Sequence, residues 1–324
     1  MDYQEHETRT TGRREFLSQI SAVAATSGLA LGKTCRAADQ QTTPAAALPT
    51  IQIGPHRVTR LVAGWNPIGG YSYMGPTMDQ HMREYFTPER IVEFLMKCER
   101  EGINTHQFSH PERMAPIFQK MREQGSKIQF ICLHSGGGEK NPVKGVVEQT
   151  RPIAMVHHGG VTDRLFADGK SQAVHDYVKR VHDAGVLAGV SAHNPDAIKR
   201  IADEAWEVDL FMNCFYYITR PHEQLAKMLP VVTVPVGKPF FKSDPDVMTK
   251  VMRQVEQPCL GFKILAAGRM SFSKHTVKEA FKYAFEHIKP IDGVIVGMYP
   301  RFRDEVAENA QHVRQFAARI AISG

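Results

Sequence analysis

The sequence predicts a single (β/α)8 barrel, an α/β fold. Three observations predict it: the periodicity of apolar residues, the number of strand–helix units and the absence of a dinucleotide-binding motif. Short apolar runs alternate with longer amphipathic runs from residue 51 to residue 324, which is typical of parallel strands joined by crossover helices. Eight such units favour a closed barrel, because closure leaves no edge strand exposed. The first strand is not followed by the Gly-x-Gly-x-x-Gly motif of open dinucleotide-binding sheets.

Each expected strand is a short apolar run followed by a helical pattern. The strands cover residues 60–64, 103–107, 128–133, 153–157, 187–191, 210–214, 260–265 and 293–297. The amphipathic runs predict helices that include 88–101, 173–184, 195–206, 244–255, 276–288 and 304–320. Two helix starts carry a capping residue followed by proline, Thr87 before Pro88 and Asn194 before Pro195.

The amino-terminal segment has the pattern of an export signal. Arg13 and Arg14 are followed by Phe16 and Leu17 and then by a weakly apolar run at 20–31. This pattern resembles a twin-arginine signal. The apolar run is too short to span a bilayer, so no stable membrane anchor is expected. The alternative is a cytoplasmic tail with a chance arginine pair.

The chain is therefore expected to divide into three segments. They are a twin-arginine signal peptide at 1–38, a polar linker at 39–50 and the barrel domain at 51–324. We expect export by the twin-arginine machinery to the periplasm or beyond it.

The composition limits the classes of partner that the protein is expected to bind. The formal charge of +6 arises from 40 basic and 34 acidic residues that are interspersed along the chain. This distribution predicts solvated helix faces and no nucleic-acid partner. Outside the signal, the cysteines form no Cys-x-x-Cys pair, which favours buried thiols over a disulfide framework.

Several segments of the mature chain resemble the aldo/keto reductases. Residues 184–194, AGVLAGVSAHN, resemble the fifth strand of that family, and residues 264–270, ILAAGRM, resemble its seventh-strand segment. Residues 51–61 resemble its opening hairpin, and 102–104 resemble the start of its second strand. The resemblance implies a barrel with an N-terminal β-hairpin.

The last strand and helix resemble the loop with which these reductases hold NADPH. The resemblance implies that NADP contacts fall on Gly297, Arg301, Arg303 and Asn309. A helix start offers backbone N–H donors, and an arginine beside it suits a phosphate.

The family's catalytic quartet of Asp, Tyr, Lys and His is not retained. The Asp position falls on Gln107, the Tyr position near Glu112 and the Lys position near His134. Only the histidine has a counterpart, as His157 or His158. Because no tyrosine stands where the family's proton donor stands, the resemblance does not extend to carbonyl reduction.

Histidines follow four adjacent strands, whose ends converge on one face of a barrel. One hypothesis is a zinc, manganese or iron ion bound by His106, His134, His157 and His193. The alternatives are metal-free acid–base chemistry, with His157 and His158 as catalytic candidates, and ordinary hydrogen-bonded rim residues. Glu139 and Asp163 lie in nearby loops and could complete a site, although Asp163 could equally cap a helix.

Other side chains near the strand ends are further candidates. Lys263, within the seventh strand, could form a Schiff base with a carbonyl substrate if it faces inward. The polar and aromatic candidates could bind a sugar or merely fill the core; they are Trp65, Asn66, Asn213 and Tyr216. Two glycine-rich loops, 69–77 and 135–139, could close over a ligand.

These observations predict an exported enzyme with a small, carbohydrate-like substrate. The expected reaction is proton transfer on a sugar, polyol or keto-sugar, of the lyase, isomerase or hydrolase type, with metal assistance as the favoured form. Two alternatives stay open, an NADP-dependent oxidoreductase exported with its cofactor bound and a non-catalytic barrel that serves as a binding protein.

Overall fold

The computed structural model describes residues 46–136, 142–228 and 238–317. The predicted signal peptide, most of the linker and Glu139 lie outside the described residues. Within the described ranges, no helix combines the length and the apolar character needed to cross a bilayer.

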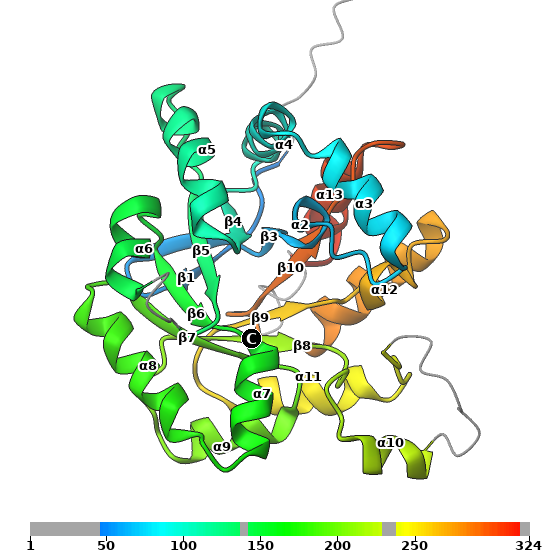
Figure 1. The fold of residues 1–324 in the computed structure, drawn as a ribbon. Coiled ribbons are helices and arrows are strands. Elements are labelled where there is room, and N and C mark those ends of the chain that lie inside the picture. Colours follow the sequence, from blue (N-terminus) through cyan, green and yellow to red (C-terminus); the bar gives the residue numbers. More distant parts are fainter. Residues whose placement is uncertain (1–45, 137–141, 229–237, 318–324) are drawn as a thin grey trace, which may run out of the picture. The chain divides into compact units, whose positions relative to one another are not determined.

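Eight parallel strands close into a barrel, which confirms the predicted fold class. Figure 1 shows the strands at the centre with helices around them. The order around the barrel is β10-β3-β4-β5-β6-β7-β8-β9. The strands are β3 (Leu61–Gly64), β4 (Thr105–Phe108), β5 (Gln129–His134), β6 (Ala154–His157), β7 (Leu187–Ala192), β8 (Leu210–Cys214), β9 (Cys259–Phe262) and β10 (Gly293–Gly297).

The helices alternate with these strands, as expected for crossover connections. They are α2 (Asn66–Gly69), α3 (Pro76–Tyr85), α4 (Pro88–Arg100), α5 (Pro111–Glu123), α6 (Val143–Thr150), α7 (Gly159–Ala167), α8 (Gln172–Asp183), α9 (Pro195–Asp203), α10 (His222–Met228), α11 (Asp244–Gln254), α12 (Lys274–His287) and α13 (Glu305–Ala317). The predicted caps are confirmed, because the side chains of Thr87 and Asn194 accept hydrogen bonds from the first turns of α4 and α9.

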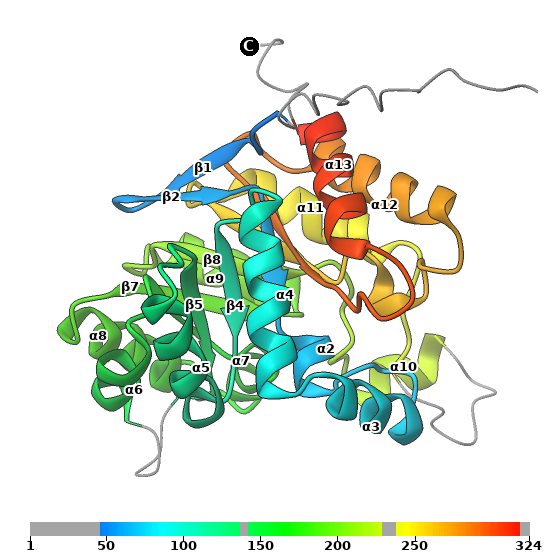
Figure 2. The same ribbon diagram turned by 90° about the horizontal axis from the view of Figure 1, so that it is seen from above.

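An antiparallel hairpin precedes the barrel, as the resemblance implied. It pairs β1 (Thr50–Ile53) with β2 (His56–Thr59). Figure 2 shows this hairpin at one end of the barrel and α2 and α3 at the opposite end. The second end is where the carboxyl ends of the strands meet, because α2 directly follows β3.

All eight predicted strands are present, and one boundary has a consequence for the site. The seventh was expected at 260–265, but β9 ends at Phe262. Lys263 has a φ of 60°, in the left-handed region, which ends the extended strand. Lys263 therefore follows the strand, and its placement within the strand was wrong.

Side chains along the strands alternate between the barrel interior and the helix layer. Val156 and Met212 belong to a buried cluster that fills the interior together with residues of the hairpin. Met155 and Phe211 belong to the larger cluster that packs strands against helices. Two residues adjacent in sequence at a strand end therefore face opposite layers.

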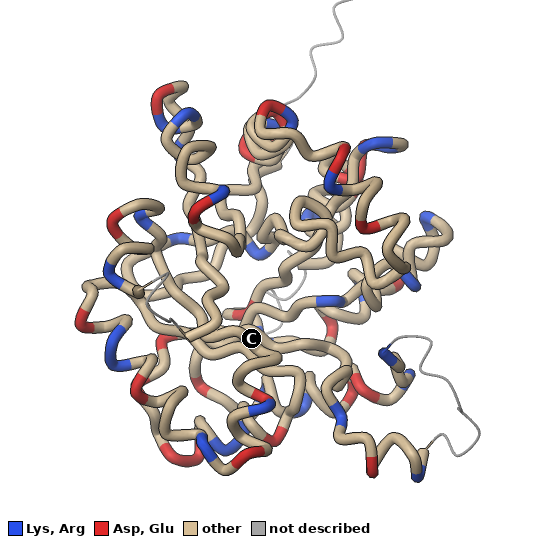
Figure 3. Tube along the Cα trace, viewed as in Figure 1, with Lys and Arg blue, Asp and Glu red and all other residues tan. Residues whose placement is uncertain are grey.

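The structure confirms two expectations drawn from composition. Basic and acidic residues are interspersed around the outer helices in the view of Figure 3. Four cysteines are free and buried; they are Cys98, Cys132, Cys214 and Cys259.

A buried arginine ties the first barrel strand to the last strand and helix. Arg60 donates hydrogen bonds to the backbone carbonyls of Asp292, Ala317 and Lys289 at 2.7, 3.0 and 3.1 Å. Its guanidinium carbon lies 4.9 Å from the ring centre of Phe285.

We expect Arg60→Met to lower the free energy of unfolding by about 3 kcal/mol or more, since three carbonyls lose their charged donor. Urea unfolding measures this change. Arg57→Met, at an exposed position of the hairpin, is the matched control and should change stability by less than about 0.5 kcal/mol. Equal effects of the two substitutions would contradict the prediction.

Candidate active site

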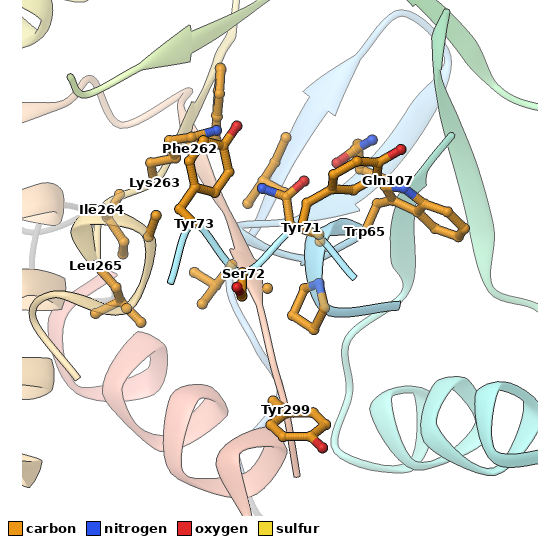
Figure 4. Close-up of a pocket in the computed structure, with 18 of the residues that line it drawn as sticks. Trp65, Tyr71, Ser72, Tyr73, Gln107, Phe262, Lys263, Ile264, Leu265 and Tyr299 are labelled. Carbon is orange, nitrogen blue, oxygen red and sulfur yellow. The ribbon is translucent and has the colours of Figure 1, made fainter. Parts of the chain in front are cut away.

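A cavity of about 370 Å³ lies at the carboxyl ends of the barrel strands, where barrel enzymes place their reacting groups. Its walls come from the ends of β3, β9 and β10, from the loop between α2 and α3, and from α13. Figure 4 shows Tyr73 of that loop beside Phe262 and Lys263. The glycine-rich loop predicted at 69–77 therefore lines the cavity.

Strand alternation divides the five candidate histidines into two groups. His158 and His193 line the cavity. The other three are absent from its lining and lie in the helix layer; they are His106, His134 and His157. Across the described residues, no group of three or more His, Cys, Asp or Glu side chains is placed to share a metal ion. The predicted convergence of His106, His134, His157 and His193 is thus corrected by the geometry.

The three histidines that lie in the helix layer make hydrogen bonds and packing contacts with other parts of the protein. His106 donates its Nδ1–H to a backbone carbonyl of β3 at 2.9 Å and packs against Phe118 of α5. The Nδ1 of His157 lies 2.7 Å from the hydroxyl of Thr162. The rings of His134 and His157 both pack against Tyr177 of α8. Of the two predicted catalytic candidates, only His158 lines the cavity.

Asp163 holds His193 in one tautomer. The Nδ1 of His193 lies 2.9 Å from Asp163 Oδ2, and because a carboxylate only accepts, Nδ1 carries the proton. The other carboxylate oxygen accepts from the backbone N–H groups of His193 and Asn194 at 3.2 and 3.1 Å, and Thr219 donates to Oδ2 at 2.8 Å. The lone pair of His193 is consequently on Nε2, in a ring that lines the cavity.

Three polar atoms of residues that line the cavity are buried without a hydrogen-bond partner in the described chain. They are Nε1 of Trp65, Nδ1 of His158 and Oγ of Ser191. Such atoms are rare in folded proteins, and a bound ligand is one way to satisfy them. Gly159 allows the crowding, because a Cβ there would lie 2.9 Å from Ser191 Oγ. These atoms are therefore available to polar groups of a substrate.

Burial keeps both cavity histidines neutral near pH 7. Burial, together with the smaller effects of the charges of His193 and Lys263, lowers the pKa of His158 to about 4. Burial also lowers the pKa of His193, against the opposing hydrogen bond to Asp163. A neutral imidazole accepts protons, so His193 has the protonation state of a general base.

Lys263 brings a positive charge to the cavity. Its Nζ lies 4.7 Å from the ring centre of Tyr73 and 4.8 Å from that of Phe262. Such contacts stabilise an ammonium group over a neutral amine. They favour an electrostatic role for Lys263 over the amine nucleophile of the predicted Schiff base.

Of the four predicted substrate-binding residues, two line the cavity and two do not. Trp65 and Asn66 line the cavity. The amide of Asn213 instead reaches the sulfur of Met248 in the helix layer at 3.7 Å. Tyr216 is absent from the lining and packs against Phe240.

The residues that stand at the family's catalytic Asp and Tyr positions lie in different surroundings. Gln107 lines the cavity, and Figure 4 shows it beside Tyr71. Glu112 is exposed and pairs with His110 at 3.3 Å. Tyr71 and Tyr73 line the cavity as part of the predicted loop 69–77. Ser191 also lines it and was not predicted, although the period of two along β7 points Ser191 to the same side as His193.

The residues predicted to hold NADP are partly in place. Gly297, Arg303 and Asn309 line the cavity. Arg301 is absent from the lining, and its guanidinium lies 5.7 Å from the ring centre of Phe302. Arg303 pairs with Glu308, so its charge is already neutralised.

Comparison with known proteins found similarity only to solved structures. No protein-family model matches the chain, and no curated protein matches it either. A mutant of Gox0644 in complex with NADPH has 13% identity and a TM-score of 0.50, over 85% of this chain and 94% of that one. An aldo/keto reductase from Brucella melitensis has 10% identity and a TM-score of 0.46, over 83% and 98%. A dihydropteroate synthase from Xanthomonas albilineans has 11% and 0.48, over 85% and 99%. At 13% identity and a TM-score of 0.50, the likeness to the first of these structures shows the fold alone.

Proposed function

We propose that this protein is an enzyme that moves a proton on a small carbonyl compound, in the manner of an isomerase or lyase. The observation that carries the proposal is the buried Asp163–His193 pair in the wall of the cavity, with neutral His158 and cationic Lys263 beside it. A base, an orienting carboxylate and a cation together are the groups that enolisation requires.

The chemistry follows from the state of each group. The C–H bond next to the carbonyl breaks, its proton goes to Nε2 of His193, and its electron pair moves to the carbonyl oxygen. Lys263 stabilises the resulting oxyanion. For an α-hydroxy ketone, the hydroxyl proton moves to the former carbonyl oxygen and Nε2 returns its proton to the former carbonyl carbon, which gives the isomeric carbonyl compound. For a substrate with a leaving group on the β-carbon, the enolate electron pair forms the Cα–Cβ double bond as that group departs, the carbonyl is restored, and the product is that of a lyase. His158 and Ser191 bind the remaining polar groups of the substrate.

We also infer that the enzyme acts outside the cytoplasm. The support is the pattern of residues 1–38, which resembles a twin-arginine signal. A twin-arginine route delivers a folded protein, which suits a closed barrel whose core draws on both ends of its chain. The carbohydrate-like substrate stays a prediction.

Deuterium exchange tests the proposed reaction. We expect the protein in D2O to accelerate exchange of the α-protons of a simple ketone, followed by NMR, and His193→Asn to reduce the rate about 10²- to 10⁴-fold. His182→Asn is the matched control, because His182 pairs with Asp209 at 2.8 Å on the surface. Exchange that is equal in the wild type and His193→Asn, across a panel of ketones and hydroxyketones, would contradict the proposal.

An NADP-dependent oxidoreductase is the second candidate function. It is favoured by Gly297, Arg303 and Asn309 in the cavity wall. The cavity also contains Glu305, and Glu308 pairs with Arg303, so phosphate groups would meet two carboxylates and one arginine. Fluorescence titration with NADPH tests this candidate, which requires binding that Arg303→Ala weakens.

A further inference from the structure

The cavity has two chemically different ends. The reactive end carries His158, His193 and Lys263. Figure 4 shows Tyr299 at the opposite side of the view from Phe262 and Lys263. The wall toward Tyr299 is mainly apolar, and we call it the methionine arm; its residues are Met78, Met82, Leu265, Val277 and Tyr299.

The methionines of the arm belong to a helix without fully buried residues. Met78 and Met82 lie one turn apart on α3, and no residue of this helix is buried. Apolar and polar contacts both hold the helix, because Met82 and Tyr85 pack against the hydrophobic core. Asp79 accepts from the backbone N–H of Ser72 at 2.8 Å, and the hydroxyl of Tyr299 lies 3.1 Å from Nδ1 of His81. Met78 and Met82 are therefore partly buried residues of α3 that line the cavity.

The charged residues beside the methionine arm already have partners within the protein. Arg303 pairs with Glu308, and Lys274 adds a second cation to the same carboxylate at 3.2 Å. Glu305 accepts from the backbone N–H of Tyr299 at 2.7 Å, and burial raises the pKa of this carboxyl. An anionic ligand group would gain little here, whereas methionine and aromatic side chains offer dispersion contacts to an uncharged body.

We propose that the substrate is an amphipathic carbonyl compound whose uncharged aromatic or aliphatic body occupies the methionine arm while its carbonyl reaches His193 and Lys263. This inference rests on the proposed proton transfer and narrows its substrate class away from sugars. A cavity of about 370 Å³ is within the range of small-molecule sites. Methionine suits such a body because its thioether is flexible and polarisable.

The probe 6-propionyl-2-(dimethylamino)naphthalene tests the inference, because it is uncharged, aromatic and a ketone whose emission shifts to the blue in apolar surroundings. We expect saturable binding with blue-shifted emission. The double variant Met78→Gln/Met82→Gln should weaken binding at least about tenfold, since it exchanges two apolar contacts for amides. Met228→Gln, at an exposed methionine of α10 that is absent from the cavity lining, is the matched control.

The outcomes separate this inference from the proposed function. Absent binding, or binding that the double variant leaves unchanged, would overturn the inference. Displacement of the probe by NADPH, with the double variant losing affinity for NADPH equally, would assign the arm to the nucleotide and also overturn it. His193→Asn should fail to exchange the α-protons of the probe for deuterium, whereas Met228→Gln should bind the probe and exchange them as the wild type does. Binding of the probe by the wild type without exchange would contradict the proposed reaction but would still support the methionine arm as a site for an uncharged body.

Discussion

Asp163→Asn is expected to lower the rate of α-proton exchange about 10³- to 10⁴-fold while the barrel stays folded. The amide oxygen of asparagine would accept from the backbone N–H groups of His193 and Asn194, as Asp163 Oδ1 does now. Its NH2 group would then occupy the place of Oδ2 and donate to Nδ1 of His193. The imidazole proton would move to Nε2, and the ring would lose the lone pair that accepts the substrate proton.

The measurement is the exchange rate by NMR, beside a circular dichroism melt of the same sample. Asp209→Asn is the control, because Asp209 accepts from Nε2 of His182 outside the cavity at a similar distance, 2.8 Å. A folded Asp163→Asn protein with the wild-type rate would show that His193 is not the base. The same loss in Asp209→Asn would show that the effect is not local to the cavity.

Acid is expected to destabilise the protein through its buried histidines, and His106 should contribute strongly. Burial lowers the pKa of folded His106 to about 4 from an ordinary value of 6.5, against the hydrogen bond to Ala63. The unfolded chain therefore takes up this proton first as the pH falls. The stability present above pH 6.5 is lost between about pH 6.5 and 4, by an amount on the order of 3 kcal/mol.

Urea unfolding at pH 7 and at pH 4.5 measures this loss in the wild type and in His106→Asn. The asparagine amide can keep the hydrogen bond to Ala63 but does not titrate, so the difference between the two pH values should shrink. Phe118→Leu, which alters the ring packed against His106, is the control and should lower stability equally at both pH values. Parallel pH dependences of the wild type and His106→Asn would contradict the assignment.

Local patterns of the sequence were enough to predict the fold. Each barrel strand is an apolar run such as 210–214, which was expected and found with the same bounds. Helix starts were predictable where a cap and a proline coincide, as at Thr87 and Pro88. These features depend on neighbours within a few residues, which is the distance over which backbone propensity and capping act.

The candidate site was predictable only in part, because its groups are set by contacts between distant residues. His157 and His158 are equivalent in the sequence, but the pleat of β6 sends the first into the helix layer and leaves the second in the cavity wall. Asp163 and His193 are 30 residues apart, and only the docking of α7 beside the end of β7 brings them to 2.9 Å.

The sequence by itself determined the barrel, the positions of its strands and the end of the barrel at which histidines gather. Only the tertiary structure decided which histidines face the cavity, that Lys263 follows its strand, and that α3 lays Met78 and Met82 over an apolar arm. The physical reason is that strand formation follows local periodicity. The direction of a side chain at a strand end instead depends on one residue of register and on the packing of elements far apart in the chain.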